Sequence, residues 1–273
     1  SVQLIDGYLN SDLYYSEFKG GDWSEPLSLG NDINTPKTWE TMPSISADGK
    51  TLYFVSDRPG GQGGYDIYMT TKRDNGTWGV PVNLGPTINT PKNEKTPFIH
   101  SDSQTLYFSS DGHMGFGGYD IFYSHIDENT GKWVTPKNIG FPINSDRDET
   151  GFFVSIDGSK GYYASNIDLN TKKTGDWNLF EFEMPESARP QKVVLIKGNV
   201  KTETGDIVEA NVTLKNTVTK SITEIPIDNY DGNYATVALM KNDYILTVKK
   251  EGFAYETHYI ETKKPETNVI QNV

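Results

Sequence analysis

The sequence contains no cysteine, which is compatible with an oxidising compartment in which no disulfide is needed. No stretch approaches the ~18–20 apolar residues of a membrane-spanning helix, and no signal peptide is visible. No window has the apolar spacing of an amphipathic helix over three turns, which argues against a helical solenoid. Basic stripes are also missing, and the net charge is −12 with a pI near 4.8. We therefore expect neither nucleic-acid binding nor direct binding to anionic membranes.

A repeat of about 55 residues runs through the first two-thirds of the chain. Residues 48–54 (DGKTLYF) return 54 positions later at 102–108 (DSQTLYF), and more loosely at 157–163 (DGSKGYY). Three tryptophans also follow this period: Trp23, Trp78 and Trp133. Three Ile-Asn pairs, which begin at Ile33, Ile88 and Ile143, follow it as well. Such periodicity predicts a stacked array of one supersecondary unit.

Each unit is predicted to contain four short antiparallel strands. In the unit that begins near Glu40, these strands are expected at 42–46, 51–55, 65–70 and 78–84. Asp48-Gly49 marks a tight turn that needs positive φ, and the Gly- and Pro-rich segment at 57–64 suits neither helix nor strand. Sheets that are apolar on both faces must pack against neighbours on both sides. The pattern therefore predicts an all-β chain with a β-propeller of four-stranded blades.

These units resemble the WD-like β-propeller repeats of the TolB type, in the form found in OmpA-family, peptidoglycan-associated envelope proteins. The resemblance covers residues 8–187, and it rests on residues 43–58 (PSISADGKTLYFVSDR), 63–68 (GGYDIY), Trp78 and 81–85 (PVNLG). The last unit departs from the pattern, because Asn178-Leu179-Phe180 replaces the Tyr-Asp-Ile core. Atypical terminal repeats are expected in such arrays.

The blades do not add up to a closed ring. Residues 39–93 and 94–148 form complete units, whereas 1–38 hold the second half of one unit and 149–187 the first three strands of another. The total lies below the usual minimum of ~4 blades. We therefore expect that the sequence begins inside a larger propeller, truncated at its N-terminal side. The alternative is a ring in which 1–38 and 149–187 share one blade.

A different β-domain is predicted for residues 191–273, after a boundary near Pro190. About seven short strands with turn signals between them indicate a β-sandwich. The segment resembles the carboxypeptidase regulatory-like, or transthyretin-like, domain at 198–200 (GNV), 210–214 (ANVTL), 232–234 (GNY) and 244–248 (YILTV). Asn242-Asp243 stands where that family usually has a Pro-Gly-like turn. The resemblance implies a packing or docking module without catalysis.

Two short motifs look like known sites and fail at a defining position. Residues 60–66 (GGQGGYD) are similar to a calcium-binding nonapeptide, but Asp66 falls one place late and tandem nine-residue copies are missing. A blade hairpin is the better interpretation, with Asp66 and Asp120 capping backbone N–H groups of the turn. Residues 46–49 (SADG) are similar to the Asp-box of sialidase propellers, except that Gly follows Asp directly.

The acidic residues that lie in register are the remaining candidates for chemistry: Asp57 with Asp111, and Glu40 with Glu94 and Glu149. They could ring a central channel, but a ring of equivalent groups differs from one acid and one base with separated pKa values. The four histidines show no metal-ligand spacing. The three periodic tryptophans are expected to pack in the repeat. We therefore predict no catalytic residue, no metal site and no cofactor.

Residues that differ between equivalent positions are the best candidates for a partner-contact surface. Trp39 has Asn93 and Asp148 as its counterparts, and four loop residues also break the repeat: Arg58, His113, Met114 and Phe116. Unmatched loop residues are more informative about binding than repeated ones.

The order of the two domains resembles PorE-type, OmpA-family envelope lipoproteins of the type IX secretion system. The resemblance implies a scaffold or adaptor without enzymatic activity, located in the periplasm and associated with the outer membrane. Its partners would be other envelope or secretion-complex proteins, and it would link a secretion or gliding complex to the outer membrane and peptidoglycan. Peptidoglycan would be bound only through a domain absent from this chain. The alternative is a carbohydrate-binding or glycan-active propeller.

Overall fold

The chain folds almost entirely into β-strands. The computed structural model describes residues 2–5, 8–168, 171, 174–262 and 268–270, and its one helical turn is the 3-10 segment η1 (Glu186–Ala188). Within these ranges no helix has the length and apolar character to cross a membrane. The chain divides into two compact units: Ser1–Tyr15 with Leu27–Pro190, and Ser16–Pro26 with Gln191–Val273.

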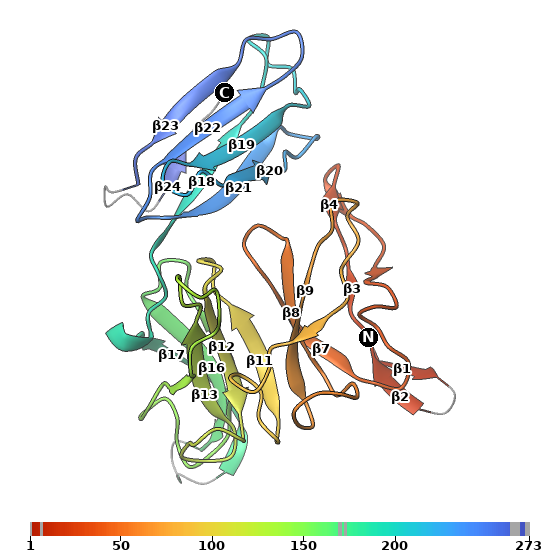
Figure 1. The fold of residues 1–273 in the computed structure, drawn as a ribbon, viewed down its shortest axis with the longest axis vertical. Helices are drawn as coiled ribbons and strands as arrows, with labels where there is room; N and C mark the ends of the chain where they lie inside the picture. Colours follow the sequence, from red (N-terminus) through yellow and green to blue (C-terminus); the bar gives the residue numbers. More distant parts are fainter. Residues whose placement is uncertain (1, 6–7, 169–170, 172–173, 263–267, 271–273) are drawn as a thin grey trace. The chain divides into compact units, whose positions relative to one another are not determined.

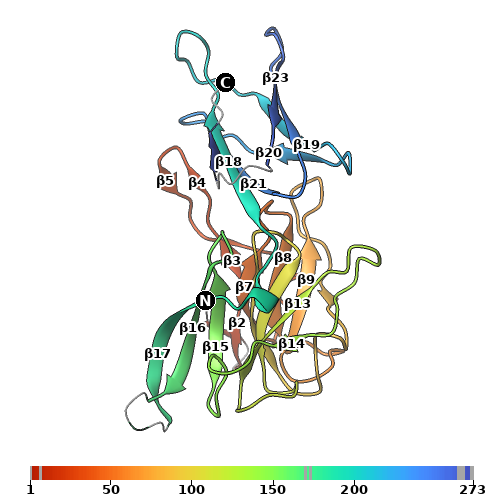
Figure 2. The same cartoon turned by 90° about the vertical axis from the view of Figure 1, so that its left-hand side faces the viewer.

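The first unit is a succession of antiparallel sheets whose register follows the sequence repeat (Figure 1). The first complete sheet holds β7 (Glu40–Ile45), β8 (Thr51–Ser56), β9 (Asp66–Thr71) and β10 (Val82–Asn83). The second holds β11 (Glu94–Ile99), β12 (Thr105–Ser110), β13 (Asp120–His125) and β14 (Lys137–Asn138). The third holds β15 (Glu149–Val154), β16 (Lys160–Ile167) and β17 (Thr174–Glu183), side by side in Figure 2.

A partial sheet precedes these three. β3 (Tyr14–Tyr15) pairs with β6 (Leu27–Ser28) in the same register in which β9 pairs with β10. The chain between them forms a hairpin of β4 (Phe18–Lys19) and β5 (Asp22–Trp23), and β1 (Val2–Ile5) pairs with β2 (Tyr8–Ser11). The partial sheet thus supplies the third and fourth strand positions of a repeat.

The turn between the first two strands of each sheet has the chemistry that the sequence predicts. In the first repeat, the Ser46 hydroxyl donates a 2.6 Å hydrogen bond to Asp48, and Asp48 accepts from the Lys50 N–H. Gly49 has a φ of +67°, which confirms the predicted positive φ. In the second repeat Ser103 takes the equivalent position with a φ of +55°, a conformation that is uncommon outside glycine.

Consecutive sheets bury each other's faces. We call the face of a sheet that packs against the following repeat its forward face. On the first sheet this face carries Tyr53 and Ile67, which cluster with Leu106 and Phe108 of the second sheet. On the second sheet Tyr107 occupies the same position and packs against the third sheet. The first and second sheets therefore each contribute one half of two apolar interfaces, as expected for sheets that are apolar on both faces.

One asparagine in each repeat joins the end of that repeat to its third strand. The Asn89 side chain accepts from the Ile67 N–H at 2.8 Å and donates to the Ile67 carbonyl at 3.0 Å. Asn34 pairs with Leu13 in the same way, and Asn144 pairs with Ile121. We call this two-bond arrangement the asparagine bridge. All three asparagines are buried, so the amide gives the N–H of one residue its partner where no neighbouring strand does, while the carbonyl of that residue also accepts from a backbone N–H.

In the second unit, the described strands of residues 191–273 form two sheets around one core. One holds β21 (Asn233–Leu239), β18 (Val193–Asn199) and β24 (Asn268–Ile270), in that order. The other holds β20 (Ile222–Ile225), β19 (Asn211–Asn216), β22 (Tyr244–Lys249) and β23 (Glu256–Ile260). Both sheets contribute to a single apolar cluster, with Ile196 from β18 and Leu246 from β22 fully buried in it.

Replacing Asn89 by alanine should lower the free energy of unfolding by about 1–3 kcal/mol, because it leaves the buried N–H of Ile67 without its partner, while the Ile67 carbonyl keeps the hydrogen bond from the Leu84 N–H. Urea denaturation measures the loss. Asn129→Ala, in an exposed turn, is the matched control. An Asn89→Ala variant as stable as this control would show that the bridge contributes nothing.

Candidate functional site

The in-register glutamates are buried, and the prediction that they line a channel is wrong. Glu94 accepts hydrogen bonds from the Thr90 N–H at 2.8 Å, the Thr90 hydroxyl at 2.7 Å and the Ser110 hydroxyl at 2.7 Å. Glu149 has the same partners in Ser145 and Ser165. Each carboxylate thus ties the loop that enters a repeat to its second strand, and has no exposed oxygen for catalysis.

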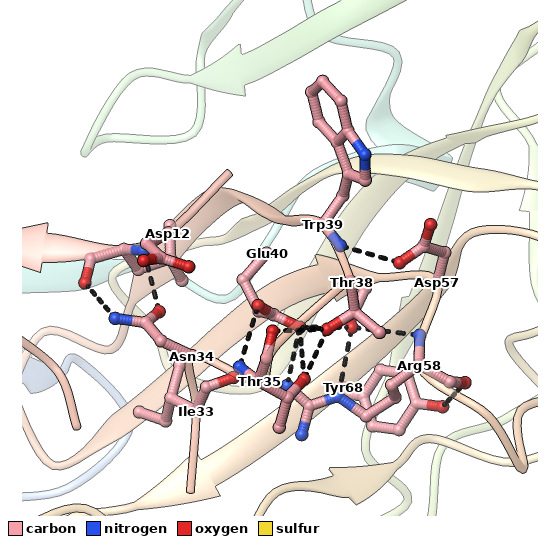
Figure 3. A network of polar contacts seen from close by, with 12 residues as sticks. Asp12, Ile33, Asn34, Thr35, Thr38, Trp39, Glu40, Asp57, Arg58 and Tyr68 are labelled. Atoms are coloured by element: carbon pink, nitrogen blue, oxygen red, sulfur yellow. Dashed lines mark hydrogen bonds and ion pairs between the residues drawn. The ribbon is translucent and has the colours of Figure 1, made fainter. Parts of the chain in front are cut away.

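The first repeat carries an additional cation at this cluster (Figure 3). Glu40 accepts from Thr38 at 2.8 Å and from Ser56 at 2.9 Å, and its Oε1 also lies 3.2 Å from the Arg58 guanidinium. A buried carboxylate is most stable when it is both paired and hydrogen-bonded. This glutamate cluster is therefore a structural element in all three repeats.

Burial changes the titration of two of these acids. Desolvation raises the pKa of Glu94 above its ordinary value of 4.5, and hydrogen bonds from Thr90 and Ser110 oppose it. Desolvation likewise raises the pKa of Glu149, against hydrogen bonds from Ser145 and Ser165. The hydroxyl and amide donors favour the charged form, but they do not compensate fully for the loss of water.

The in-register aspartates cap the start of the first strand of each sheet. Asp57 accepts the Trp39 N–H at 2.7 Å, and Asp111 accepts the Asn93 N–H at 2.8 Å. Trp39 therefore takes the place that Asn93 occupies one repeat later. Its indole is half-buried and points away from the hydrogen-bonded cluster around Glu40, as Figure 3 shows. Trp39 is thus an aromatic side chain that the equivalent positions of the other repeats lack, and its backbone N–H is hydrogen-bonded to Asp57.

The polar groups of Arg58 and His113 reach equivalent surroundings, although the backbone counterpart of Arg58 is Gly112. The Arg58 guanidinium donates to the Ile33 carbonyl at 2.6 Å and lies over the rings of Phe54 and Tyr68. The His113 ring meets the Ile88 carbonyl at 2.8 Å, the equivalent atom one repeat later, and contacts Phe108 and Phe122. Both polar groups contact a carbonyl of the loop that precedes their repeat. A smaller part of either side chain is therefore available to contact a partner.

Met114 and Phe116 lie in the same loop as His113, and their side chains are exposed to solvent. Met114 is 94% exposed and Phe116 is 59% exposed. The loop is held by Asp120, which accepts from the Phe116 N–H at 2.8 Å and the Gly117 N–H at 3.1 Å. Asp66 caps the equivalent N–H groups in the first repeat, which confirms the predicted capping role of both aspartates.

The glycines of this loop are required by close packing. A Cβ at Gly117 would lie 2.2 Å from the Arg147 carbonyl oxygen, and one at Gly63 would lie 2.2 Å from that of Lys92. Only glycine allows the loop to approach the following repeat so closely. The loop that carries Met114 and Phe116 is therefore anchored at both ends.

Sequence reasoning missed Lys95. Its ammonium lies 4.6 Å from the ring centre of Tyr119 and 5.4 Å from that of Tyr65, so it bridges two successive repeats by cation–π contacts. Burial raises the pKa of Tyr65, and the nearby Asp57 charge raises it further. Thr41 and Thr150 take the equivalent positions. This difference between repeats is the signal that would have identified Lys95.

The tryptophans that follow the period do not behave alike. Trp133 packs edge-on against Tyr53 of the preceding repeat at 6.2 Å, and Trp78 packs against the cluster that holds Leu52 and Phe54. These two confirm the predicted packing role. Trp23 is 67% exposed and contacts Phe18 in the β4–β5 hairpin, so for it the prediction is wrong. In the described ranges no three His, Asp or Glu side chains are grouped to hold a metal ion.

No family model matches the chain, and no curated protein matches it in sequence. Among solved structures, TolB from Acinetobacter baumannii is 12% identical with a TM-score of 0.40, over 91% of this chain and 48% of that one. An α-L-arabinanase from Penicillium chrysogenum, solved with arabinobiose, is 12% identical with a TM-score of 0.38, over 92% of this chain and 85% of that one. A puromycin-hydrolysing peptidase from Mycobacterium tuberculosis is 11% identical with a TM-score of 0.37, over 91% of this chain and 40% of that one.

These neighbours include TolB and other β-propeller proteins. The chain spans about half the length of the TolB structure. At this identity and TM-score the likeness assigns neither an activity nor a ligand.

The expectation that the chain has no enzymatic activity is contradicted by these findings. The structural neighbours are mostly glycosidases and peptidases, among them an α-L-arabinofuranosidase from Lactobacillus brevis. Sequence reasoning excluded an enzyme because repeated acids suggested architecture. Proteins with propeller-like folds nevertheless include many enzymes, so the repeat does not justify that exclusion.

The raised pKa of Glu94 predicts a specific pH dependence of stability. The folded chain binds this proton more tightly than the unfolded chain, whose glutamates titrate near 4.5. Above pH 4.5 this group therefore lowers the free energy of unfolding as the pH rises, until the raised pKa is passed. The free energy of unfolding of the wild type minus that of Glu94→Gln should decrease as the pH rises through that window. Urea denaturation across the pH range measures it.

The exposed variant Glu203→Gln gives the background effect of removing one negative charge. After correction for this background, the free energy of unfolding of the wild type minus that of Glu94→Gln should not increase with pH. An increase would contradict the raised pKa of Glu94.

Proposed function

We propose that this chain is a protein-interaction module of a bacterial cell envelope. In this proposal it links a type IX secretion or gliding complex to the outer membrane and peptidoglycan from the periplasmic side. The sheets of the first unit act as blades of a β-propeller, and the second unit acts as a regulatory-like β-sandwich. Contact with peptidoglycan is made by a further domain outside this sequence.

One observation carries the proposal: the repeated polar residues are used internally, whereas Met114 and Phe116 project from an anchored loop. The two side chains are 94% and 59% exposed, and Asp120 holds the loop beneath them. Large apolar side chains on a rigid surface are typical of the central residues of protein interfaces. The resemblance of the repeat to envelope proteins supports the compartment and the class of partner.

Affinity capture from an envelope extract that contains a type IX secretion complex tests this proposal. The tagged chain should capture secretion-complex or outer-membrane proteins, identified by mass spectrometry. Met114→Ser combined with Phe116→Ser should reduce that capture about tenfold or more, because two apolar contacts are lost. The stability of the variant should not change, since both side chains are exposed.

Val80→Ser is the matched control, because Val80 is also exposed, at 67%, but lies in another loop. Two results would count against the proposal: an extract that yields no envelope partner, or a double variant that captures as much as the control.

Glycan binding is a second candidate, favoured by the aromatic side chains near Lys95. Tyr65 and Tyr119 flank the ammonium, and Asp57 connects this group to the backbone of Trp39. Aromatic rings beside charged groups are suited to stacking against sugars and orienting their hydroxyls. Binding on a glycan array that Trp39→Ala abolishes would support this candidate. An array without signal would remove it.

A further inference from the structure

β17 is an edge strand at a place where the two preceding sheets have a further strand (Figure 2). β10 pairs with β9 and β14 pairs with β13, whereas among the described residues no strand pairs with β17 on the side away from β16. We call this side of β17 the open edge. Leu179 of β17 takes the register position that Ile67 has in the first sheet and Ile121 has in the second.

The backbone of the open edge carries hydrogen-bonding groups without a partner. The Met184 N–H donates to the Ser159 carbonyl, which fixes the alternation of the antiparallel pair. Leu179 and Glu181 therefore direct their N–H and C=O groups away from β16. In the described ranges no hydrogen bond reaches these groups. The open edge is thus a row of donors and acceptors that a further strand can use.

The fourth strand and the loop after it fill this place in the earlier repeats. Ile67 donates its N–H to Asn89, and its carbonyl accepts from the Leu84 N–H. The same two bonds hold the counterpart of Ile67 in the second repeat. The side chains of Leu84 and Ile88 also pack in the cluster that buries Ile67. Leu179 lacks this cover and is 87% exposed, whereas Ile67 is 0% exposed.

The segments that fill this place share one sequence pattern. An aliphatic residue is followed by glycine, two further residues, isoleucine and asparagine, and we call this pattern the fourth-strand motif. Its glycine has a φ of +91°, +77° and +90° in the three repeats, a conformation that glycine adopts without a steric cost. Its asparagine forms the asparagine bridge. The motif occurs at 29–34 (LGNDIN), 84–89 (LGPTIN) and 139–144 (IGFPIN).

We propose that the open edge binds an extended segment of a partner protein that carries the fourth-strand motif and adds to the third sheet as its fourth strand. The asparagine of this segment accepts the Leu179 N–H, and its aliphatic residue donates to the Leu179 carbonyl. The aliphatic and isoleucine side chains cover the Leu179 side chain. The open edge belongs to another sheet than the loop of Met114 and Phe116, so it binds its partner independently of that loop.

Charge selects among segments that carry the motif. In the second sheet Lys137 stands two positions before the motif and pairs with Tyr123, which has the register position of Glu181. Side chains of directly paired residues lie on the same face of a sheet, so a lysine at this place in the partner faces Glu181. Glu181 also contacts Lys160 at 2.6 Å, and a carboxylate can accept from both ammonium groups. The open edge therefore favours a segment with a cation two positions before its motif.

A labelled peptide with the sequence of residues 137–145 (KNIGFPINS) tests this proposal, because it combines the motif with that lysine. Fluorescence anisotropy with the full chain should show saturable binding. The peptide with Asn144→Ala should bind at least about tenfold more weakly, because the Leu179 N–H loses its acceptor. The peptide with Gly140→Val should also bind at least about tenfold more weakly, since valine disfavours the positive φ.

Two proline variants of the full chain locate the binding. Leu179→Pro removes an N–H that faces away from β16, so it keeps the pairing with β16 and should weaken binding of the unaltered peptide at least about tenfold. Glu183→Pro is the matched control, because its N–H also faces away from β16 but lies beyond the residues that the peptide covers. It should bind as the wild type does. The peptide variants need no change in the chain, so they decide even where a proline variant does not fold.

Three results would overturn the proposal. The first is that the unaltered peptide does not bind the wild-type chain. The second is that the peptide with Asn144→Ala binds as tightly as the unaltered one. The third is that the folded Leu179→Pro chain binds the peptide as tightly as Glu183→Pro does.

Discussion

The asparagine bridge is the interaction on which the first unit depends. Asn34, Asn89 and Asn144 each accept the N–H of one backbone residue at the third strand and donate to its carbonyl, which also accepts from a backbone N–H of the fourth strand position. A buried N–H or C=O without a partner costs about 1–3 kcal/mol, so the bridge ties the end of each repeat to its own sheet. The neighbouring isoleucines Ile33, Ile88 and Ile143 enter the apolar interfaces between sheets through the same loop. One short loop thus fixes both the closure of a repeat and its packing against the next.

The glutamate clusters extend this arrangement across the boundary between repeats. Each carboxylate accepts from the loop that follows the asparagine and from the second strand of the next sheet. The polar residues that recur with the period are consequently engaged in connecting repeats. In our proposal recognition depends on residues that differ between repeats, such as Met114 on its exposed loop and Lys95 between two tyrosines. This division explains why the prominent motifs of the sequence describe the architecture and not the function.

Local features of the fold could be predicted from the sequence, whereas the environment of single side chains could not. The Asp48-Gly49 turn and the third strand at Asp66 follow from turn chemistry and alternation, which depend on neighbouring residues. The burial of Glu94 depends on Thr90 and Ser110, which the fold brings together from a loop and a strand. The shared role of Arg58 and His113 was hidden because the two residues differ chemically and lie one position out of register, although both meet equivalent carbonyls. Trp23 keeps the period in sequence and pairs with Phe18 as Trp78 pairs with Lys72, yet its side chain is 67% exposed.

Native-state hydrogen exchange at the amides of Ile67 and Ile121 tests the central claim most directly. Both N–H groups donate to an asparagine side chain and to no strand, and both lie in the buried interfaces between sheets. If the bridge is the constraint that holds each repeat closed, these amides should exchange only through global unfolding, as slowly as those of Phe54 and Phe108. Exchange at the rate of an exposed loop, with the strand amides still protected, would contradict this account.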